Sequence, residues 1–480
     1  MPESLKSQVI KGTIWNGLER FGTAFFLFLS NLVLARLLSP DDFGCIGMLM
    51  VFISVSDAIV DGGFGAALVQ KKDVRSIDYS TIFIWNVIVS VALYIVLFIS
   101  SPAIASFYNI DYLEIILKVQ GIVLLFNGLC IIQRSMFQRD LMFKKLAKIN
   151  LSATIIGTLL GIICAFAGLG VWSLVAKLLF TSVIASMLLW VKSDYLPSLK
   201  FSWKSFSTLF NFGSFMFLTS MTNSIHSNSI SLVIGKGINS AALGYFTQAQ
   251  KLEDIPRQTL SSVVMNVAFP AFSKLQDSQK ELVFSVRATT RLLSYINFSL
   301  TILMMVVARP LILLLFSEKW ERSISYFQMI CLFGLIYTIT EFYNSILKAK
   351  GESRILFITN LIYKVLGVLL IFWGAFWGMR GILLTFVVSY YIGFALVSYA
   401  ICKTIHYTFA SQIGDLLPSL VIAFISGLAT WLAMTIVDCD HHVVSLLIGV
   451  SIFMSVSILA SHIIKFEPYC FLKDLVKRNH

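Results

Sequence analysis

Residues 15–70 contain the segments W-N-G-L-E-R-F-G-T (15–23), L-A-R-L-L-S-P-D-D-F-G (34–44) and D-G-G-F-G-A-A-L-V-Q (61–70). Two long apolar runs, 12–38 and 43–66, flank the short segment Ser39-Pro40-Asp41-Asp42. Each run exceeds the roughly 20 helical residues that cross a bilayer core. Ser39 is a good N-cap, Pro40 suits the first turn, and the aspartates complement the positive end of a helix. The stretch therefore predicts two membrane-spanning helices joined by a tight turn outside the membrane.

Charged residues interrupt both apolar runs. A charge at the bilayer centre costs about 2.5–3.5 kcal/mol even on the milder scale, so such residues are expected to face protein or water. Asn16, Arg20 and Thr23 follow an i, i+4, i+7 spacing and share one helix face. The pattern predicts that this hairpin lines an aqueous cavity, and its intramembrane charges are Glu19, Arg20, Asp57 and Asp61.

The composition is that of a polytopic membrane protein. Hydrophobic residues make up 57% of the 480 residues and charged ones 13%, against about 45–50% and 25% in soluble domains. Unsatisfied backbone groups are excluded from lipid, so the spans are expected to be helices. About fourteen spans are predicted: 12–38, 43–66, 79–101, 112–133, 150–167, 170–191, 213–235, 243–266, 289–316, 325–347, 354–376, 380–402, 416–436 and 443–465.

The net charge of +12 follows the topology. With the N-terminus inside, most Lys and Arg fall in inner segments, and the loop 134–148 is especially basic. This asymmetry is the positive-inside rule, which predicts two cytoplasmic termini and makes a nucleic-acid partner unnecessary. The outer loops carry only Arg36, Lys236, Lys319, Arg322 and Arg380.

The chain contains a weak internal repeat. A shift of 200 places 34–44 on 234–244, so that Ser39 falls on Asn239 and Gly44 on Gly244. A shift of 210 places 150–174 on 360–384. Six spans separate the copies, so both halves enter the membrane in the same direction. We expect two six-helix lobes, 1–200 and 201–405, related by a parallel repeat, followed by two C-terminal helices within 406–480.

The span 213–235 is unusually polar. Ser, Thr and Asn join helices in membranes, but polar residues all round one helix favour a face that meets water or a polar ligand. His226 is either a proton carrier or a hydrogen-bonded wall residue. The polar residues of this span are Thr219, Ser220, Thr222, Asn223, Ser224, His226, Ser227, Asn228, Ser229 and Ser231.

No cofactor or metal site is expected. The seven cysteines show no CxxC spacing and mostly lie within spans, as small packing residues do. The segment Asp438-Cys439-Asp440-His441-His442 contains metal-binding residue types, but it is a short outer loop, so we expect no metal there. No hydrophilic segment is long enough for a soluble catalytic domain, so an enzyme is not expected.

Four segments resemble one family. They are 34–44, 61–70, Q-R-S-M-F-Q-R-D-L-M-F (133–143) and A-L-G-Y-F-T-Q-A-Q-K-L (242–252). Together they are similar to the polysaccharide exporter branch of the multidrug/oligosaccharidyl-lipid/polysaccharide flippase superfamily, which includes transporters for lipopolysaccharide, O-antigen, colanic acid and teichuronic acid. The resemblance implies two lobes in a V around a cationic cavity. It also implies alternating-access transport of an undecaprenyl-diphosphate-linked glycan to the outer leaflet of the bacterial inner membrane.

A diphosphate headgroup that crosses the membrane needs basic partners, because burying unpaired charge costs several kcal/mol or more. Asn16, Asn223, His226 and Asn228 are the candidates for binding the glycan. Other membrane proteins of polysaccharide assembly are further expected partners, besides the bilayer. The candidate headgroup ligands are Arg20, Lys118, Lys177, Lys251, Arg257, Arg291 and Lys364.

Acidic residues within the spans leave an alternative open. Asp57 and Asp61 share a helix face and are candidates for coupling transport to an ion gradient. A multidrug cation exporter of the same superfamily would need a carboxylate-dominated cavity and usually twelve spans. Glu253 and Arg257, at i and i+4, are expected to pair. The number of spans and of intramembrane bases favours the flippase.

Overall fold

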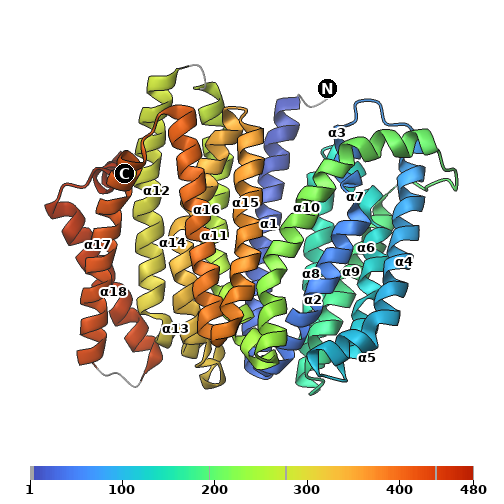
Figure 1. Cartoon of the computed structure of the whole chain (residues 1–480), viewed down its shortest axis with the longest axis horizontal. Helices are drawn as coiled ribbons and strands as arrows, with labels where there is room; N and C mark the ends of the chain where they lie inside the picture. The colour runs from blue at the N-terminus through green and yellow to red at the C-terminus, as the bar shows by residue number, and fades with distance from the viewer. Residues whose placement is uncertain (1–4, 194, 276–277, 438–440, 479–480) are drawn as a thin grey trace. The chain divides into compact units, whose positions relative to one another are not determined.

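The computed structural model describes residues 5–193, 195–275, 278–437 and 441–478, without the side chains at 5–14, 16, 18, 20–21, 212, 262–271, 273–274 and 475–478. The described chain is helical and contains no strand. It forms two compact units, Met1–Gly244 and Tyr245–His480. The all-α class is therefore confirmed (Figure 1).

The first unit is a bundle in which α8 packs on α1 and α9, and α10 packs on α2, α3 and α4. Its last residues open α11, which continues into the second unit. The helices are α1 (Leu5–Leu37), α2 (Pro40–Asp61), α3 (Phe64–Gln70), α4 (Ser76–Tyr108), α5 (Leu113–Gln120), α6 (Ile122–Gly128), α7 (Ile131–Arg139), α8 (Phe143–Phe166), α9 (Val171–Lys192) and α10 (Trp203–Gly237).

The second unit is built around α12, which packs on α14 and α17, while α16 packs on α14 and α15. Its core includes Phe342, Tyr343, Val397 and Ile401, each fully buried. The elements are α11 (Ser240–Lys274), α12 (Gln279–Val306), α13 (Ala308–Phe316), η1 (Glu318–Trp320), α14 (Ser323–Ala349), α15 (Ser353–Gly374), η2 (Ala375–Trp377), α16 (Gly378–Ile405), α17 (Phe409–Ile436), α18 (His442–Ile463) and α19 (Glu467–Arg478).

The predicted turn between the first two spans is confirmed. Ser39 caps α2: its hydroxyl accepts the backbone N–H of Asp42, and the Asp42 carboxylate accepts the Ser39 N–H at 2.8 Å. Pro40 is the first helical residue, where its missing N–H costs nothing. This reciprocal capping box fixes where the chain turns back into the bundle.

Predicted span 43–66 is not one continuous helix. It ends as α2 at Asp61 and restarts as α3 at Phe64, because Gly62 and Gly63 have φ of +54° and +73°. Glycine adopts this left-handed conformation at little cost. Gly63 also lies against Gly213 of α10, where a methyl group would come within 2.2 Å of the carbonyl oxygen. The break therefore provides room for a close helix contact.

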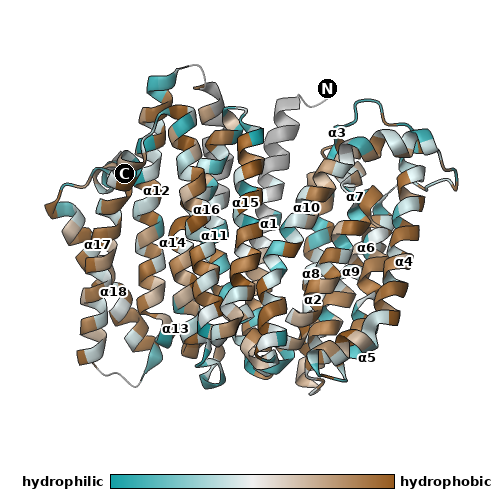
Figure 2. Cartoon of the chain, viewed as in Figure 1, coloured by the Kyte–Doolittle hydropathy of each residue, from teal (hydrophilic) through white to brown (hydrophobic). Residues whose placement is uncertain are grey.

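Ten helical stretches of the described residues are long and apolar enough to span a membrane. One of them, Ser353–Ile405, covers both α15 and α16, while the apolar part of α1, Gly22–Leu37, counts as a shorter helix. Figure 2 shows hydrophobic residues along most helices, with hydrophilic ones concentrated at helix ends and loops. The multi-pass membrane prediction is confirmed, and the number fourteen stays a prediction.

The two lobes predicted from the repeat also stay a prediction. The repeat places the boundary near residue 200, and α10 would open the second lobe. In the structure α10 contacts α2, α3 and α4, and the division into units falls after Gly244. The repeat marks two parts of the sequence that resemble each other, whereas the two units are defined by which residues contact one another. The two boundaries therefore need not coincide.

Candidate functional site

Asp57 belongs to a hydrogen-bonded network in the first unit. Asn127 of α6 donates to the Asp57 carboxylate at 3.0 Å, and Ser182 of α9 donates to the Asn127 carbonyl at 2.8 Å. Asp61 accepts the backbone N–H of Gly63 at the helix break, at 3.3 Å. The exposed Arg134 is in electrostatic range of both carboxylates. The two acids are thus half-buried, with polar partners on α6 and at the break between α2 and α3, and with Arg134 of α7 in range of both.

Some polar residues of α10 contact a neighbouring helix, and others are exposed. Asn228 donates to the Ser54 hydroxyl of α2 at 2.8 Å and to its own helix, so it joins two helices. His226 is buried, with 6% of its surface exposed. Asn223 is exposed. Of the three predicted glycan ligands on this helix, Asn223 is therefore the accessible one.

Two of the predicted headgroup ligands, Lys118 and Lys177, have polar partners within the first unit. Lys118 forms an ion pair with Glu114, one helical turn away, and its ammonium lies 4.8 Å from the centre of the Phe98 ring. Lys177 of α9 donates to the Ser30 hydroxyl of α1 at 2.8 Å. Lys118 is paired near a helix end, whereas Lys177 is a half-buried charge within a span.

Asn16 and Arg20 lie in α1, and their side chains are outside the described part of the structure. The neighbouring Glu19 is described: Asn150 of α8 donates to its carboxylate. An intramembrane acid on α1 is thus paired with an amide of the adjacent helix, as expected for polar groups within lipid. Asp438-Cys439-Asp440 also lies outside the described residues.

Arg257 is the centre of the charged group in the second unit. Its guanidinium donates to Glu253 at 2.9 Å and to Asp254, which confirms the predicted i, i+4 pair. It also lies 4.3 Å from the centre of the Tyr337 ring and 5.1 Å from that of Phe333. Two carboxylates and two rings therefore hold this base in a fixed position.

Sequence reasoning missed the aromatic residues around Arg257. Phe333 and Tyr337 of α14 and Phe386 and Tyr390 of α16 form one cluster, with the Phe333 and Tyr390 ring centres 4.3 Å apart. With 40 Phe and 16 Tyr in the chain, ring count alone does not separate this cluster from lipid-facing positions. The i, i+4 spacing of Phe333 with Tyr337, and of Phe386 with Tyr390, is the signal that was available.

Arg291 lies in a separate ionic cluster. Arg291 and Arg287 of α12 both donate to Asp415 of α17, each at 2.7 Å, and Arg291 also pairs with Glu467 of α19. Tyr407 donates to the same Asp415 carboxylate at 2.7 Å, and burial raises the pKa of Tyr407, which keeps its hydroxyl a donor. This cluster connects α12 to the C-terminal helices.

Lys251 and Lys364 are the remaining predicted headgroup ligands. Lys251 is exposed and lies on α11, less than two turns before Arg257. Lys364 of α15 is half-buried, and its ammonium lies 5.9 Å from the centre of the neighbouring Tyr363 ring. Lys251, Arg257 and Lys364 all belong to the second unit, on helices that carry or adjoin the aromatic cluster.

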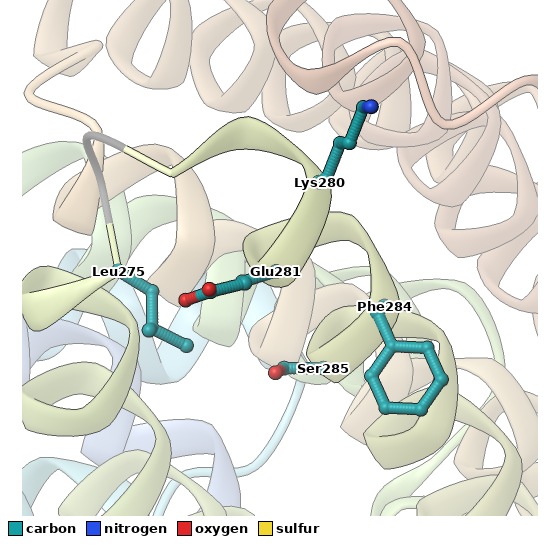
Figure 3. Close-up of a pocket in the computed structure, with 5 residues that line it drawn as sticks. All are labelled: Leu275, Lys280, Glu281, Phe284 and Ser285. Carbon is teal, nitrogen blue, oxygen red and sulfur yellow. The ribbon is translucent and has the colours of Figure 1, made fainter.

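Two of the cavities that described residues line lie in the second unit. An open pocket at the start of α12 is lined by Leu275, Lys280, Glu281, Phe284 and Ser285, and contains none of the predicted site residues (Figure 3). A cavity of about 10 Å³ lies beside Glu253, Arg257, Asn297, Thr301 and Cys331. That volume is at the lower limit for one water molecule. Contact between Arg257 and a sugar there would require the helices to move apart.

The comparisons with known proteins agree with these observations. Lipopolysaccharide biosynthesis protein WzxC of Escherichia coli (strain K12) is 25% identical over 411 residues, which cover 84% of this chain and 82% of WzxC. Teichuronic acid biosynthesis protein TuaB of Bacillus subtilis (strain 168) is 25% identical, with 77% of this chain and 76% of TuaB covered.

The fold is that of a known transporter. The solved structure of lipid II flippase MurJ, in an inward closed conformation, superposes with a TM-score of 0.76 at 16% identity, covering 95% of this chain and 99% of that one. A family model described as "Polysaccharide biosynthesis protein" matches residues 33–325. Because that match spans more than half of the sequence, this chain belongs to the polysaccharide biosynthesis protein family.

Proposed function

We propose that this protein is a flippase that moves a lipid-diphosphate-linked oligosaccharide from the cytoplasmic to the outer leaflet of the bacterial inner membrane by alternating access. The observation that carries the proposal is the family match over 33–325, in a chain whose spans hold basic and hydroxyl side chains at membrane depth. The relatives named above serve lipopolysaccharide and teichuronic acid biosynthesis, and the fold is shared with a lipid II flippase. Both termini would lie in the cytoplasm, as the positive-inside rule requires.

Location selects the headgroup ligands among the predicted bases. We assign Lys251, Arg257 and Lys364 to the diphosphate, because all three lie in the second unit on helices that carry or adjoin the aromatic cluster. A lipid tail needs no enclosed site, because it can stay in the bilayer while the headgroup crosses.

The aromatic cluster is suited to the sugar. Small-ligand sites combine hydrophobic and aromatic walls with a few polar groups that fix orientation. Tyr337 and Tyr390 are half-buried beside Arg257, and Glu341 lies one turn after Tyr337. Rings would pack on the apolar faces of the sugar, while the charged groups bind its hydroxyls. Such a protein makes or breaks no covalent bond in its substrate.

Ion coupling by Asp57 and Asp61 is part of this proposal. A multidrug exporter would also use such acids. The relatives, however, are named for polysaccharide biosynthesis rather than drug export. We therefore assign the carboxylates to driving the cycle rather than to binding a cationic drug.

Deletion of the gene in its own organism tests the proposal. We expect lipid-linked glycan to accumulate in the inner leaflet and the surface polysaccharide to disappear, with both restored by the wild-type gene. The Lys251→Ala/Lys364→Ala variant should restore neither, while Lys118→Ala should restore both. Normal surface glycan and no accumulated precursor in the deletion strain would overturn the proposal.

A further inference from the structure

Glu341 of α14 lies among three tyrosines of the second unit. The ring centres of Tyr337 and Tyr390 are 6.2 Å apart, and those of Tyr363 and Tyr390 are 6.1 Å apart. Glu341 is in electrostatic range of all three tyrosines. All four side chains are half-buried, so part of each stays accessible. The aromatic wall that we assign to the sugar therefore contains a carboxylate.

The surrounding residues hold this carboxylate and one of the rings in place. The Asn344 amide donates to Glu341 Oε1 at 3.2 Å, and Asn344 itself is 3% exposed. The Tyr363 ring lies on Gly393 of α16, where a methyl group would come within 3.1 Å of it. A carboxylate accepts hydrogen bonds and donates none. A ligand group placed among these rings therefore meets a fixed acceptor with negative charge.

The bases near the aromatic wall already have acidic partners. Arg257 pairs with Glu253 and Asp254, and Lys364 is in electrostatic range of Glu341. A diphosphate that binds the three assigned bases would use the positive charge that they supply. None of these bases would then remain to neutralise a second anion on the sugar, and burying an unpaired charge is costly.

We infer that Glu341 makes this transporter selective for glycans whose sugar at the aromatic wall is uncharged, and that it rejects a uronic acid there. The inference rests on the proposed transport function and names its substrate class. Hydroxyl groups of a neutral sugar can donate to Glu341 while the tyrosine rings pack on its apolar faces. A sugar carboxylate in the same place would face Glu341 as a like charge away from bulk water, where repulsion is strong. Repulsion of the wrong ligand is a common source of specificity.

Matched lipid-linked probes test the inference by binding to the full chain in nanodiscs of zwitterionic lipid. The neutral probe is an undecaprenyl-diphosphate-linked trisaccharide of glucose. The acidic probes carry glucuronic acid in place of one glucose, at each position in turn. We expect the acidic probe with its uronic acid at the wall to bind about tenfold or more weakly than the neutral probe.

Variants of Glu341 assign the selectivity to one residue. Glu341→Gln keeps the shape and an acceptor oxygen but removes the charge, so the rejected probe should bind about tenfold more tightly, with the neutral probe changed by no more than about twofold. Glu341→Asp keeps the charge and should keep the rejection. Glu281→Gln is the matched control: it removes the same charge at the start of α12, outside the tyrosine cluster, and should change neither Kd. Thermal unfolding in detergent checks that each variant is folded.

The outcomes separate the selectivity from the transport function. Equal affinity of the wild type for the neutral probe and all acidic probes would overturn the selectivity and leave the flippase proposal standing. Unchanged rejection in folded Glu341→Gln would also overturn it, because another group would then be responsible. If the wild type binds neither the neutral nor any acidic probe, the flippase proposal itself is wrong, and the selectivity is wrong with it.

Discussion

Two arginines that look alike in the sequence have different surroundings. Arg257 pairs with Glu253 and Asp254, which are four and three residues away, respectively, on the same helix. Arg291 pairs with Asp415, which is 124 residues away. Helical spacing predicts the first pair, but only tertiary packing creates the second. A list of intramembrane bases therefore cannot by itself separate headgroup ligands from structural ion pairs.

Asp415→Ala is predicted to destabilise the protein. It leaves Arg287 and Arg291 without their shared carboxylate, and removing one partner of a buried pair costs about 3–5 kcal/mol. The arginine side chains are 40% and 30% exposed and can regain water, so we expect a loss of about 2–3 kcal/mol. Thermal unfolding in detergent measures it. Glu114→Gln, at the more exposed pair with Lys118, should cost at most about 1 kcal/mol; equal losses in the two variants would contradict this account.

Arg257 can be separated into structural and transport roles. Arg257→Ala leaves Glu253, 3% exposed, as a buried carboxylate without its strongest partner, so the protein level should fall. Arg257→Gln combined with Glu253→Gln replaces the ion pair by neutral amides and should restore the level. If Arg257 binds the headgroup, export should stay low in this double variant. Wild-type surface glycan at a normal protein level would show that Arg257 only supports the fold.

At the scale of elements, the sequence predicts helix starts better than helix breaks. S-P-D-D at 39–42 predicts the cap of α2 because the side chains that form it are adjacent in the chain. The single predicted span 112–133 is instead covered by three short helices, α5, α6 and α7, and Gly62–Gly63 divides the predicted span 43–66. A break is favoured only when another helix approaches it, as Gly213 approaches Gly63. Hydropathy contains no such information.

The break between α2 and α3 can be tested with two glycines of similar conformation. Gly63 has φ +73° and Gly168 has φ +77°, but only Gly63 faces a neighbour, the carbonyl of Gly213. An alanine in the left-handed conformation costs about 1–2 kcal/mol at either site. Gly63→Ala should cost about 1–3 kcal/mol more, because its methyl group displaces α10. Equal unfolding temperatures for the two variants would show that the contact with α10 contributes nothing.

At the scale of the whole molecule, composition and charge asymmetry are sufficient to predict the class of protein, a multi-pass membrane protein. Apolar runs, the polar span and the repeat predict an all-α membrane transporter, and the helices of the described residues and the MurJ-like fold confirm the all-α membrane class. The site was predicted less completely. Asn228 is predicted to bind the glycan from its residue type; in the structure it donates to Ser54, and its role toward the glycan stays a prediction. Polar groups at membrane depth serve packing and transport alike, and only their partners distinguish the two.

At the scale of the whole molecule, transport is predicted to be driven by an ion gradient through Asp57 and Asp61. Ser182 donates to the Asn127 carbonyl, which turns the Asn127 amide toward Asp57. This arrangement stabilises a carboxylate that must lose and regain a cation if it couples transport to a gradient. Asp57→Asn with Asp61→Asn keeps the shapes and removes both charges. We expect normal protein level and about tenfold less export, with the response to a proton uncoupler lost. Ser182→Ala, which leaves both acids in place, should keep that response. Wild-type export by the Asp57/Asp61 double variant, slowed by the uncoupler to the same degree, would place the coupling site elsewhere in the chain.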